Sequence, residues 1–151
     1  MPEWNLTGSR MFSHAAKFID AYHNVLQPLC RETGLPPMAM DILLFVANNP
    51  DRNTASDICQ CRGLKPGIVS VHVDRLVNEG LLVRAEAAND RRKTRLTCTE
   101  KAQPIVAEGR KLQKAFANKL SAGINESDME SFRRTLTRFG ENLEDILRHG
   151  L

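Results

Sequence analysis

The sequence of 151 residues lacks three features, and each absence excludes a class of protein. It has no run of about 18 uninterrupted apolar residues, which excludes an ordinary membrane-spanning helix. Residues 1–10 lack the charged-then-apolar order of a secretory signal peptide, so we expect a cytoplasmic protein. The sequence also has no glycine-rich phosphate loop, no G-x-S-x-G and no H-E-x-x-H. We therefore expect neither enzyme activity nor a bound cofactor.

Cysteine and histidine are few, and neither is spaced as metal ligands are. Cys30, Cys59, Cys61 and Cys98 are too unevenly placed for the disulfide framework of a small secreted domain. The pair Cys59-Gln-Cys61 lacks a second ligand pair and the four histidines are scattered, so we expect no metal site. We expect Cys59 and Cys61 to be buried, inert thiols. Peroxide sensing by Cys30, with Arg31 as the local charge that could lower its pKa, stays open.

The amino-acid composition, with 42% apolar and 26% charged residues, is typical of a globular protein. The length predicts one domain that covers residues 1–151. The net charge of +3 is unevenly spread, because residues 62–95 hold eight basic and four acidic side chains. Positive charge concentrated in one block is typical of a surface that faces a polyanion. A solvated surface would have the same composition, so charge alone leaves both interpretations open.

Apolar periodicity and turn residues predict two short helices in the middle of the sequence, joined by a tight turn. Thr54 can cap the first helix, which ends near Gly63, and the second runs from Pro66 to Asn78. This order is typical of a helix-turn-helix. In the second helix the predicted buried side holds Val69, Val73, Leu76 and Val77.

Two strands, at residues 81–86 and 94–98, are predicted directly after these helices, with the polar, basic segment 87–93 between them. A helix-turn-helix followed at once by a basic hairpin is a winged helix. Thr99 can cap the long helix that comes next, and Pro104 lies about one turn inside it, where it would bend or delay the helix. A further short helix over residues 37–48 precedes the helix-turn-helix.

The first and last helices carry more apolar surface than one neighbouring helix needs. Residues 12–26 hold two adjacent apolar stripes, and the last helix, which starts at Asn125, has apolar residues at alternating spacings of three and four. We therefore predict that these helices pair with a second copy of the chain. The residues predicted to form this dimer contact are Phe12, Ile19, Phe116, Met129, Phe132, Leu136, Phe139, Leu143 and Ile146.

Four ordered segments resemble the MarR family of bacterial transcription regulators: Val73-Asp74-Arg75-Leu76, Gly80-Leu81-Leu82-Val83-Arg84, Asp90-Arg91-Arg92 and Leu96-Thr97-Cys98-Thr99. The resemblance implies a mostly helical fold, with a winged helix-turn-helix and a small β-hairpin wing over 37–98, and dimerisation helices over 10–30 and 99–149. It further implies a homodimer, acting as a repressor on a pseudo-palindromic operator in double-stranded DNA. A small lipophilic or phenolic effector would release the operator.

The resemblance assigns roles to residues of the winged helix. Residues 66–78 would be the recognition helix, Arg92 would enter the minor groove, and Asp90 would orient it. Ile68 and Val71 stand where the family often has polar side chains; apolar contacts can read a thymine methyl but cannot supply a bidentate hydrogen-bond code. The residues predicted to contact DNA are Lys65, Gly67, Ile68, Ser70, Val71, Arg75, Arg91, Arg92 and Lys93.

Alternatives remain open for some of these residues and for the function. Arg75 could instead pair locally, for example with an acidic neighbour on its own helix. We predict an effector pocket where the dimer lobe meets the winged helix, although its lining would serve equally well as core. A thiol-based oxidant sensor and a winged helix used only for protein–protein interaction are the alternative functions. The residues predicted to line the pocket are Phe18, Tyr22, Met38 and Met40.

Overall fold

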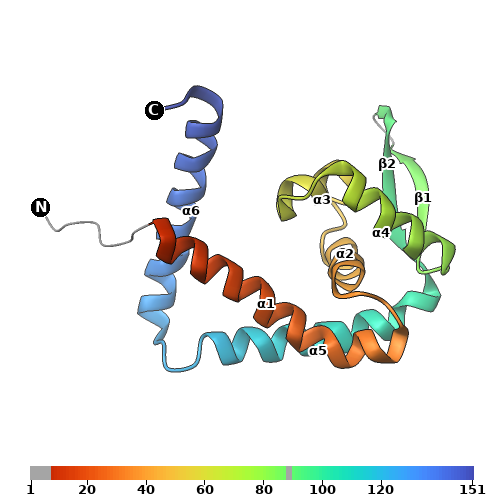
Figure 1. Ribbon diagram of the computed structural model, residues 1–151, viewed down its shortest axis with the longest axis horizontal. Helices are drawn as coiled ribbons and strands as arrows, with labels where there is room; N and C mark the ends of the chain where they lie inside the picture. The colour runs from red at the N-terminus through yellow and green to blue at the C-terminus, as the bar shows by residue number, and fades with distance from the viewer. Residues whose placement is uncertain (1–7, 88–89) are drawn as a thin grey trace, which may run out of the picture. The chain divides into compact units, whose positions relative to one another are not determined.

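The computed structural model describes the backbone of residues 8–87 and 90–151 and the side chains of residues 10–86 and 93–151. Its fold is mostly helical with a two-stranded antiparallel hairpin, as predicted (Figure 1). The chain divides into two compact units, Met1–Phe116 and Ala117–Leu151. The elements are α1 (Gly8–Thr33), α2 (Pro37–Asn48), α3 (Ala55–Arg62), α4 (Pro66–Asn78), β1 (Leu82–Ala87), β2 (Asp90–Cys98), a 3₁₀ turn (Glu100–Ala102), α5 (Gln103–Leu120) and α6 (Glu126–His149).

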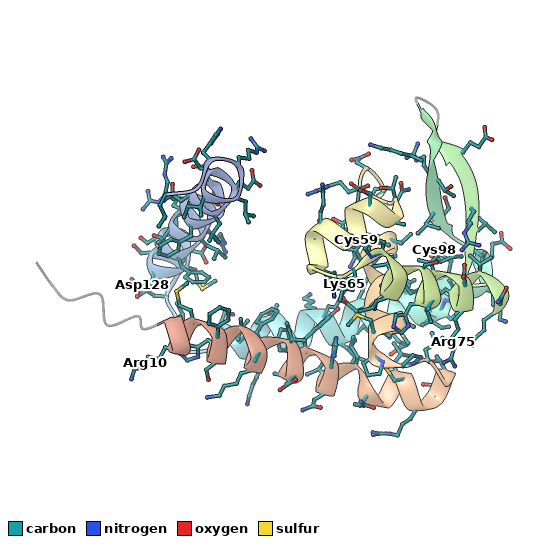
Figure 2. The ribbon with its side chains drawn as sticks, turned by 45° about the horizontal axis from the view of Figure 1, so that its top comes forward. Arg10, Cys59, Lys65, Arg75, Cys98 and Asp128 are labelled. Atoms are coloured by element: carbon teal, nitrogen blue, oxygen red, sulfur yellow. The ribbon has the colours of Figure 1, made fainter. Side chains whose placement is uncertain are left out.

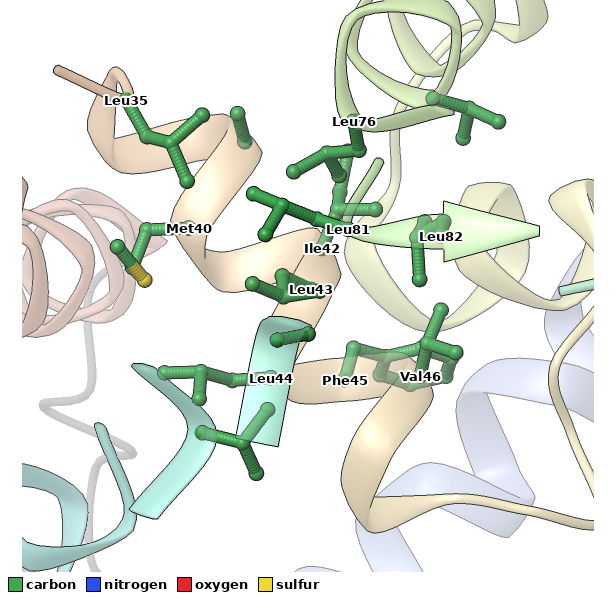
Figure 3. Packing of buried hydrophobic residues seen from close by; sticks show 14 of the residues in the cluster. Leu35, Met40, Ile42, Leu43, Leu44, Phe45, Val46, Leu76, Leu81 and Leu82 are labelled. Atoms are coloured by element: carbon green, nitrogen blue, oxygen red, sulfur yellow. The ribbon is translucent and has the colours of Figure 1, made fainter. Parts of the chain in front are cut away.

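Helix α2 is the centre of the core of the first unit. Every residue from Ala39 to Val46 is buried, because α1, α4 and β2 all pack against this helix. A helix that is apolar on all sides needs such a complete enclosure. Figure 3 shows Leu43 and Leu44 of α2 packed in the same cluster as Leu76 of α4 and Leu81. The winged helix therefore shares one hydrophobic core with α1 and α2.

The helix-turn-helix forms as its sequence predicts. The Thr54 hydroxyl accepts a hydrogen bond from the Asp57 backbone N–H at 3.1 Å, and the Asp57 carboxylate accepts one from the Thr54 N–H at 3.1 Å. This capping box fixes the start of α3, and its hydrogen bonds lower the pKa of Asp57. Gly63, with φ of 62°, ends α3 in the left-handed conformation that glycine adopts without strain. Helix α4 then turns Val69, Val73 and Leu76 into the core, as predicted.

The wing is the hairpin of β1 and β2, and its loop is shorter than predicted. The prediction placed residues 87–93 outside the strands, whereas β2 begins at Asp90 and Ala87 pairs with Asp90. Backbone pairing with β1 extends the strand into a charged segment of low strand propensity, which is a tertiary effect that composition does not reveal. On its other side β2 contacts the segment before α3, where the Leu96 N–H donates to the Asn53 carbonyl at 2.9 Å.

The predicted boundaries of α1 and α5 were wrong for two physical reasons. Helix α1 runs to Thr33, three residues past its predicted end, with Pro28 inside it; burial of Leu29 and Cys30 on the core side holds the last turn in place. Thr99 does not cap α5, because its hydroxyl donates to the Gly80 carbonyl at 2.6 Å. The 3₁₀ turn intervenes and places Pro104 in the first turn of α5, where its missing N–H costs nothing.

Gly109→Ala is expected to lower the free energy of unfolding by about 1–3 kcal/mol, the usual cost of overpacking a core. A Cβ at Gly109 would lie 2.9 Å from Leu44 Cδ1 and closer still to Cδ2. Leu44 is fully buried in the core cluster, so its side chain can shift only by displacing its neighbours. Gly140 in α6 is the matched control, since nothing lies within 4 Å of its Cβ position; there the helix propensity of alanine should add up to about 1 kcal/mol. Urea denaturation of both variants checks this, and greater stability of Gly109→Ala would contradict the close packing.

Candidate nucleic-acid interface and apolar cavity

The first two turns of α4 expose most of the residues predicted to contact DNA. Val69 holds this end of the helix on the core and is fully buried, whereas Ile68 is 45% and Val71 66% exposed. Lys65 is the N-cap residue, and apart from the adjoining residues and backbone of its own helix no atom lies within 4 Å of the position that a Cβ of Gly67 would take. The helix N-terminus adds a partial positive charge to that of Lys65. This end of α4 is therefore an open, positively charged surface with an apolar centre.

Fewer basic side chains are available to DNA than the sequence indicates. Of the eight basic residues in the block 62–95, four arginines form hydrogen bonds or ion pairs within the protein. Arg84 pairs with Asp74. The contacts of the other three arginines are Arg62 with Asp41, Arg75 with Glu79 and Gly34, and Arg95 with Asn53 and Pro50. Among the described side chains of the block, Lys65 and Lys93 keep their ammonium groups out of ion pairs and are exposed. The free charge therefore lies at the start of α4 and on β2.

Arg75 adopts the local pairing that the sequence left open. Its Nε donates to Glu79 Oε1 at 2.9 Å and its Nη2 to the Gly34 carbonyl at 2.7 Å. Lys65 and Arg75 lie at opposite ends of α4 (Figure 2). The guanidinium thus links the C-terminal half of α4 to the loop after α1, and its predicted contact with DNA has no support here.

The wing is braced against α4 and against the turn that follows α2. Arg84 of β1 pairs with Asp74 of α4, and Arg95 Nη2 of β2 donates to the Pro50 carbonyl at 3.2 Å. Lys93 is exposed on β2, whereas the side chains of Asp90, Arg91 and Arg92 lie outside the described residues. Their predicted roles at the wing stay predictions.

A largely apolar cavity of about 560 Å³ opens between α1, α2, α3 and α5 of the first unit. Three of the four predicted pocket residues line it, but Met40 does not. Met40 is fully buried in the core cluster (Figure 3), because the helical position two residues after Met38 turns it away from the cavity. The lining residues are Phe18, Ile19, Tyr22, His23, Met38, Asp41, Asn48, Cys61, Arg62, Leu64, Gln113 and Phe116.

Aromatic rings form one wall of the cavity. Phe116, predicted as a dimer residue, packs edge-on against Phe18 with ring centres 5.4 Å apart and lies 5.5 Å from the ring of Tyr22. Ile19, also predicted for the dimer contact, lines the cavity as well. A flat apolar molecule would find the aromatic contacts that such rings favour.

A chain of hydrogen bonds fixes the polar groups of this cavity. Arg110 Nε donates to Asn48 Oδ1 at 3.0 Å, Asn48 Nδ2 donates to Gln113 Oε1 at 2.9 Å, and Gln113 Nε2 donates to the Tyr22 hydroxyl at 2.8 Å. Burial raises the pKa of Tyr22, so its hydroxyl stays neutral. That oxygen accepts from Gln113, and the hydroxyl also faces the Asp41 carboxylate, which raises its pKa further. The Tyr22 hydroxyl is therefore a fixed, neutral polar group in the lining of the cavity.

An ion pair connects α2 to α3 beside the cavity. Arg62 Nε donates to Asp41 Oδ2 at 2.9 Å and Arg62 Nη2 to Asp41 Oδ1 at 3.2 Å, and the guanidinium lies 5.0 Å from the ring centre of Phe45. Asp41 is 4% exposed. The pair was not predicted, although an aspartate inside an otherwise apolar helix signals a buried partner.

The cysteines give little support to oxidant sensing. Burial raises the pKa of Cys30 and of Cys98, which disfavours the reactive thiolate. The expectation of buried thiols at residues 59 and 61 was wrong for Cys61, which is exposed, and only partly right for Cys59. The short helix α3 turns one side to the core, and the fully buried Ile58 occupies it.

In the described part of the chain, no cluster of three or more His, Cys, Asp or Glu side chains could hold a metal ion. None of the helices described there is long and apolar enough to cross a membrane.

The helix-turn-helix and its braced hairpin define a winged-helix protein. A model of the MarR family matches residues 33–93. The transcriptional regulator PA3341 is 23% identical, over 92% of this chain and 99% of its own, with a TM-score of 0.77. A MarR family transcriptional regulator from Listeria monocytogenes, complexed with 26mer DNA, is 17% identical over 93% of each chain, with a TM-score of 0.74. CouR from Rhodococcus jostii RHA1, bound to p-coumaroyl-CoA, is 20% identical over 87% of this chain and 89% of its own, with a TM-score of 0.67.

These similarities confirm the predicted fold and the predicted resemblance. Residues 33–93 of this chain are therefore similar to the MarR family of transcriptional regulators, and the chain shares the fold of the solved structures.

Proposed function

We propose that the protein is a transcriptional repressor that binds a pseudo-palindromic operator in double-stranded DNA as a homodimer and acts in the cytoplasm. The observation that carries the proposal is the open N-terminal half of α4, which is positively charged, held on the core by its other side, and followed by a braced wing. A structural neighbour complexed with 26mer DNA supports this use of the fold. The free charges of Lys65 and Lys93 suit phosphate contacts, which position a protein on the duplex.

The homodimer is supported by the second unit, in which no residue of α6 is buried in the single chain. Phe132, Leu136 and Leu143 are 57%, 55% and 58% exposed along one side of the helix. An apolar stripe of this length is costly in water and is stable when a second helix covers it. Two-fold symmetry would then present two winged helices to two half-sites of one operator.

The effector site of this proposal is the apolar cavity. Its volume of about 560 Å³ suits a small organic molecule, and its aromatic wall and oriented Tyr22 hydroxyl favour a lipophilic or phenolic compound. A neighbour bound to p-coumaroyl-CoA supports a ligand of aromatic character. The cavity touches both α1 and α3, so a ligand that separates them would shift the helix-turn-helix through the Asp41–Arg62 pair. Release of the operator would follow from this shift.

Tyr22→Phe and Met38→Ala are expected to weaken effector binding while operator binding without effector stays within about twofold. Tyr22→Phe removes only the hydroxyl, and a lost hydrogen bond of about 1 kcal/mol corresponds to about fivefold in affinity. A thermal-shift screen with phenolic, fatty-acyl and drug-like compounds identifies the effector first. Loss of stability with an intact response to every effector found would show that both residues serve only as core.

Selection from a random pool of duplex DNA tests the proposed function. The purified full chain should enrich one sequence motif with two-fold symmetry, and a duplex with that motif should bind more tightly than a scrambled one. Enrichment of no motif, together with recovery of a protein partner through the same face of α4, would instead support a winged helix used for protein–protein interaction.

A further inference from the structure

The exposed centre of the α4 surface is apolar rather than polar. Ile68 and Val71 are one helical turn apart and therefore share a side of α4, where they are 45% and 66% exposed. The core does not need them, because Val69 and Val73 already fill the buried side. Two large apolar side chains thus stand at the positions of the recognition helix that would lie deepest in a major groove.

Polar side chains that could read a base edge by two hydrogen bonds are missing from the same two turns of α4. Ser70 offers a single hydroxyl, Gly67 has no side chain, and the partly buried His72 does not carry the paired donor and acceptor of an amide. Further along the helix, Asp74 is held by Arg84 and Arg75 by Glu79 and Gly34. The described residues of these turns therefore supply almost no hydrogen-bond code for bases.

We infer that Ile68 and Val71 read thymine, through apolar contact with its 5-methyl group in the major groove. The inference rests on the proposed binding of DNA. The surroundings of the patch favour duplex DNA as the occupant, since the N-terminus of α4 and Lys65 add positive charge beside the apolar centre, and the exposed Lys93 adds a further positive charge on the wing. A thymine methyl beside a phosphate backbone is complementary to this patch, because it pairs an apolar group with an anionic surface.

The expected size of each contact follows from burial of apolar surface. One methyl group removed from water contributes about 0.8 kcal/mol, which corresponds to about fourfold in affinity. Each half-site should therefore hold at least two thymines at which loss of the methyl weakens binding about fourfold. A site read by bidentate hydrogen bonds would not depend on this group.

The test replaces each thymine of the selected operator in turn by deoxyuridine, which lacks only the methyl group and keeps every hydrogen-bonding atom of the base. Fluorescence anisotropy with the full chain should show about fourfold weaker binding at the contacted positions and no change at flanking ones. Where a contacted T·A pair is changed to C·G, 5-methylcytosine should bind more tightly than cytosine.

Protein variants show which side chains make the contacts. Ile68→Ala and Val71→Ala should each bind the thymine and deoxyuridine forms of one position with equal affinity. Both side chains are exposed, so the variants should keep the thermal stability of the parent chain. Lys93→Ala is the matched control, since loss of a phosphate contact weakens both forms alike.

The outcomes separate this inference from the proposed function. Sequence-specific binding that is indifferent to deoxyuridine at every position would overturn the thymine contacts and leave the DNA-binding function intact. Sensitivity to deoxyuridine that persists in both alanine variants would assign the methyl contacts to other residues and overturn the inference as well. Absence of any duplex binding would overturn both.

Discussion

Phe132→Glu is expected to convert the protein from a dimer into a monomer at micromolar concentration. The ring of Phe132 is 57% exposed in the single chain and lies within the apolar stripe of α6. In the proposed dimer a glutamate there would be buried without a partner, at a cost of several kcal/mol. Operator affinity should fall by two orders of magnitude or more, because a monomer contacts only one half-site. Sedimentation equilibrium measures the mass, and Leu136→Glu should behave in the same way.

Thr137→Glu is the matched control for this substitution. It introduces the same charge on α6, roughly 140° around the helix from Phe132 at 3.6 residues per turn, and Thr137 is exposed. This variant should remain a dimer with unchanged operator affinity. A monomeric parent protein, or equal dissociation of the Thr137 and Phe132 variants, would contradict an interface on the stripe.

Arg92→Ala is expected to weaken operator binding by about 1–3 kcal/mol, or roughly five- to 150-fold, the range for a specific side-chain contact with DNA. In the proposed complex the Arg92 guanidinium would enter the narrow minor groove, where the negative potential is concentrated. Lys93→Ala should weaken all sequences alike and lower the salt slope by about one, because in the proposed complex its ammonium group would contact a phosphate. Anisotropy on the operator and on a scrambled duplex, each over a range of salt, distinguishes the two effects. Equal losses for the two variants on both duplexes would contradict a groove-specific role of Arg92.

Asp90→Ala tests the orientation of the wing arginine. Electrostatics alone predicts tighter binding, since a negative charge close to DNA is removed. If Asp90 holds the Arg92 side chain in one pose, its loss increases the entropy cost of binding and the complex weakens. We expect the weaker complex, and unchanged or tighter binding would show that Asp90 does not organise the wing.

Local chemistry explains why much of the winged helix could be predicted. Each of its main features is determined by a few consecutive residues. These features are the Thr54 cap with Asp57, the left-handed Gly63 and the apolar side of α4. Such signals depend on neighbours in sequence and survive folding unchanged. The separation of buried Val69 from exposed Ile68 follows from helical periodicity alone.

The parts that could not be predicted depend on residues far apart in the sequence. The Asp41–Arg62 pair joins residues 21 positions apart, and the hydrogen bond from Gln113 to Tyr22 spans 91. No periodicity places these groups together. Arg75 and Arg95 likewise donate hydrogen bonds to carbonyl groups that are distant in sequence, those of Gly34 and Pro50. A count of basic residues therefore overestimated the charge available to DNA.

The dependence of duplex DNA binding on salt concentration tests the central claim most directly. The dissociation constant of the full chain for its selected operator should rise steeply between about 50 and 200 mM salt, with a log–log slope near the number of phosphates contacted. The operator should stay at least about a thousandfold preferred over a scrambled duplex at physiological salt. Binding that is weak, independent of salt and equal for both duplexes would contradict a DNA-binding regulator.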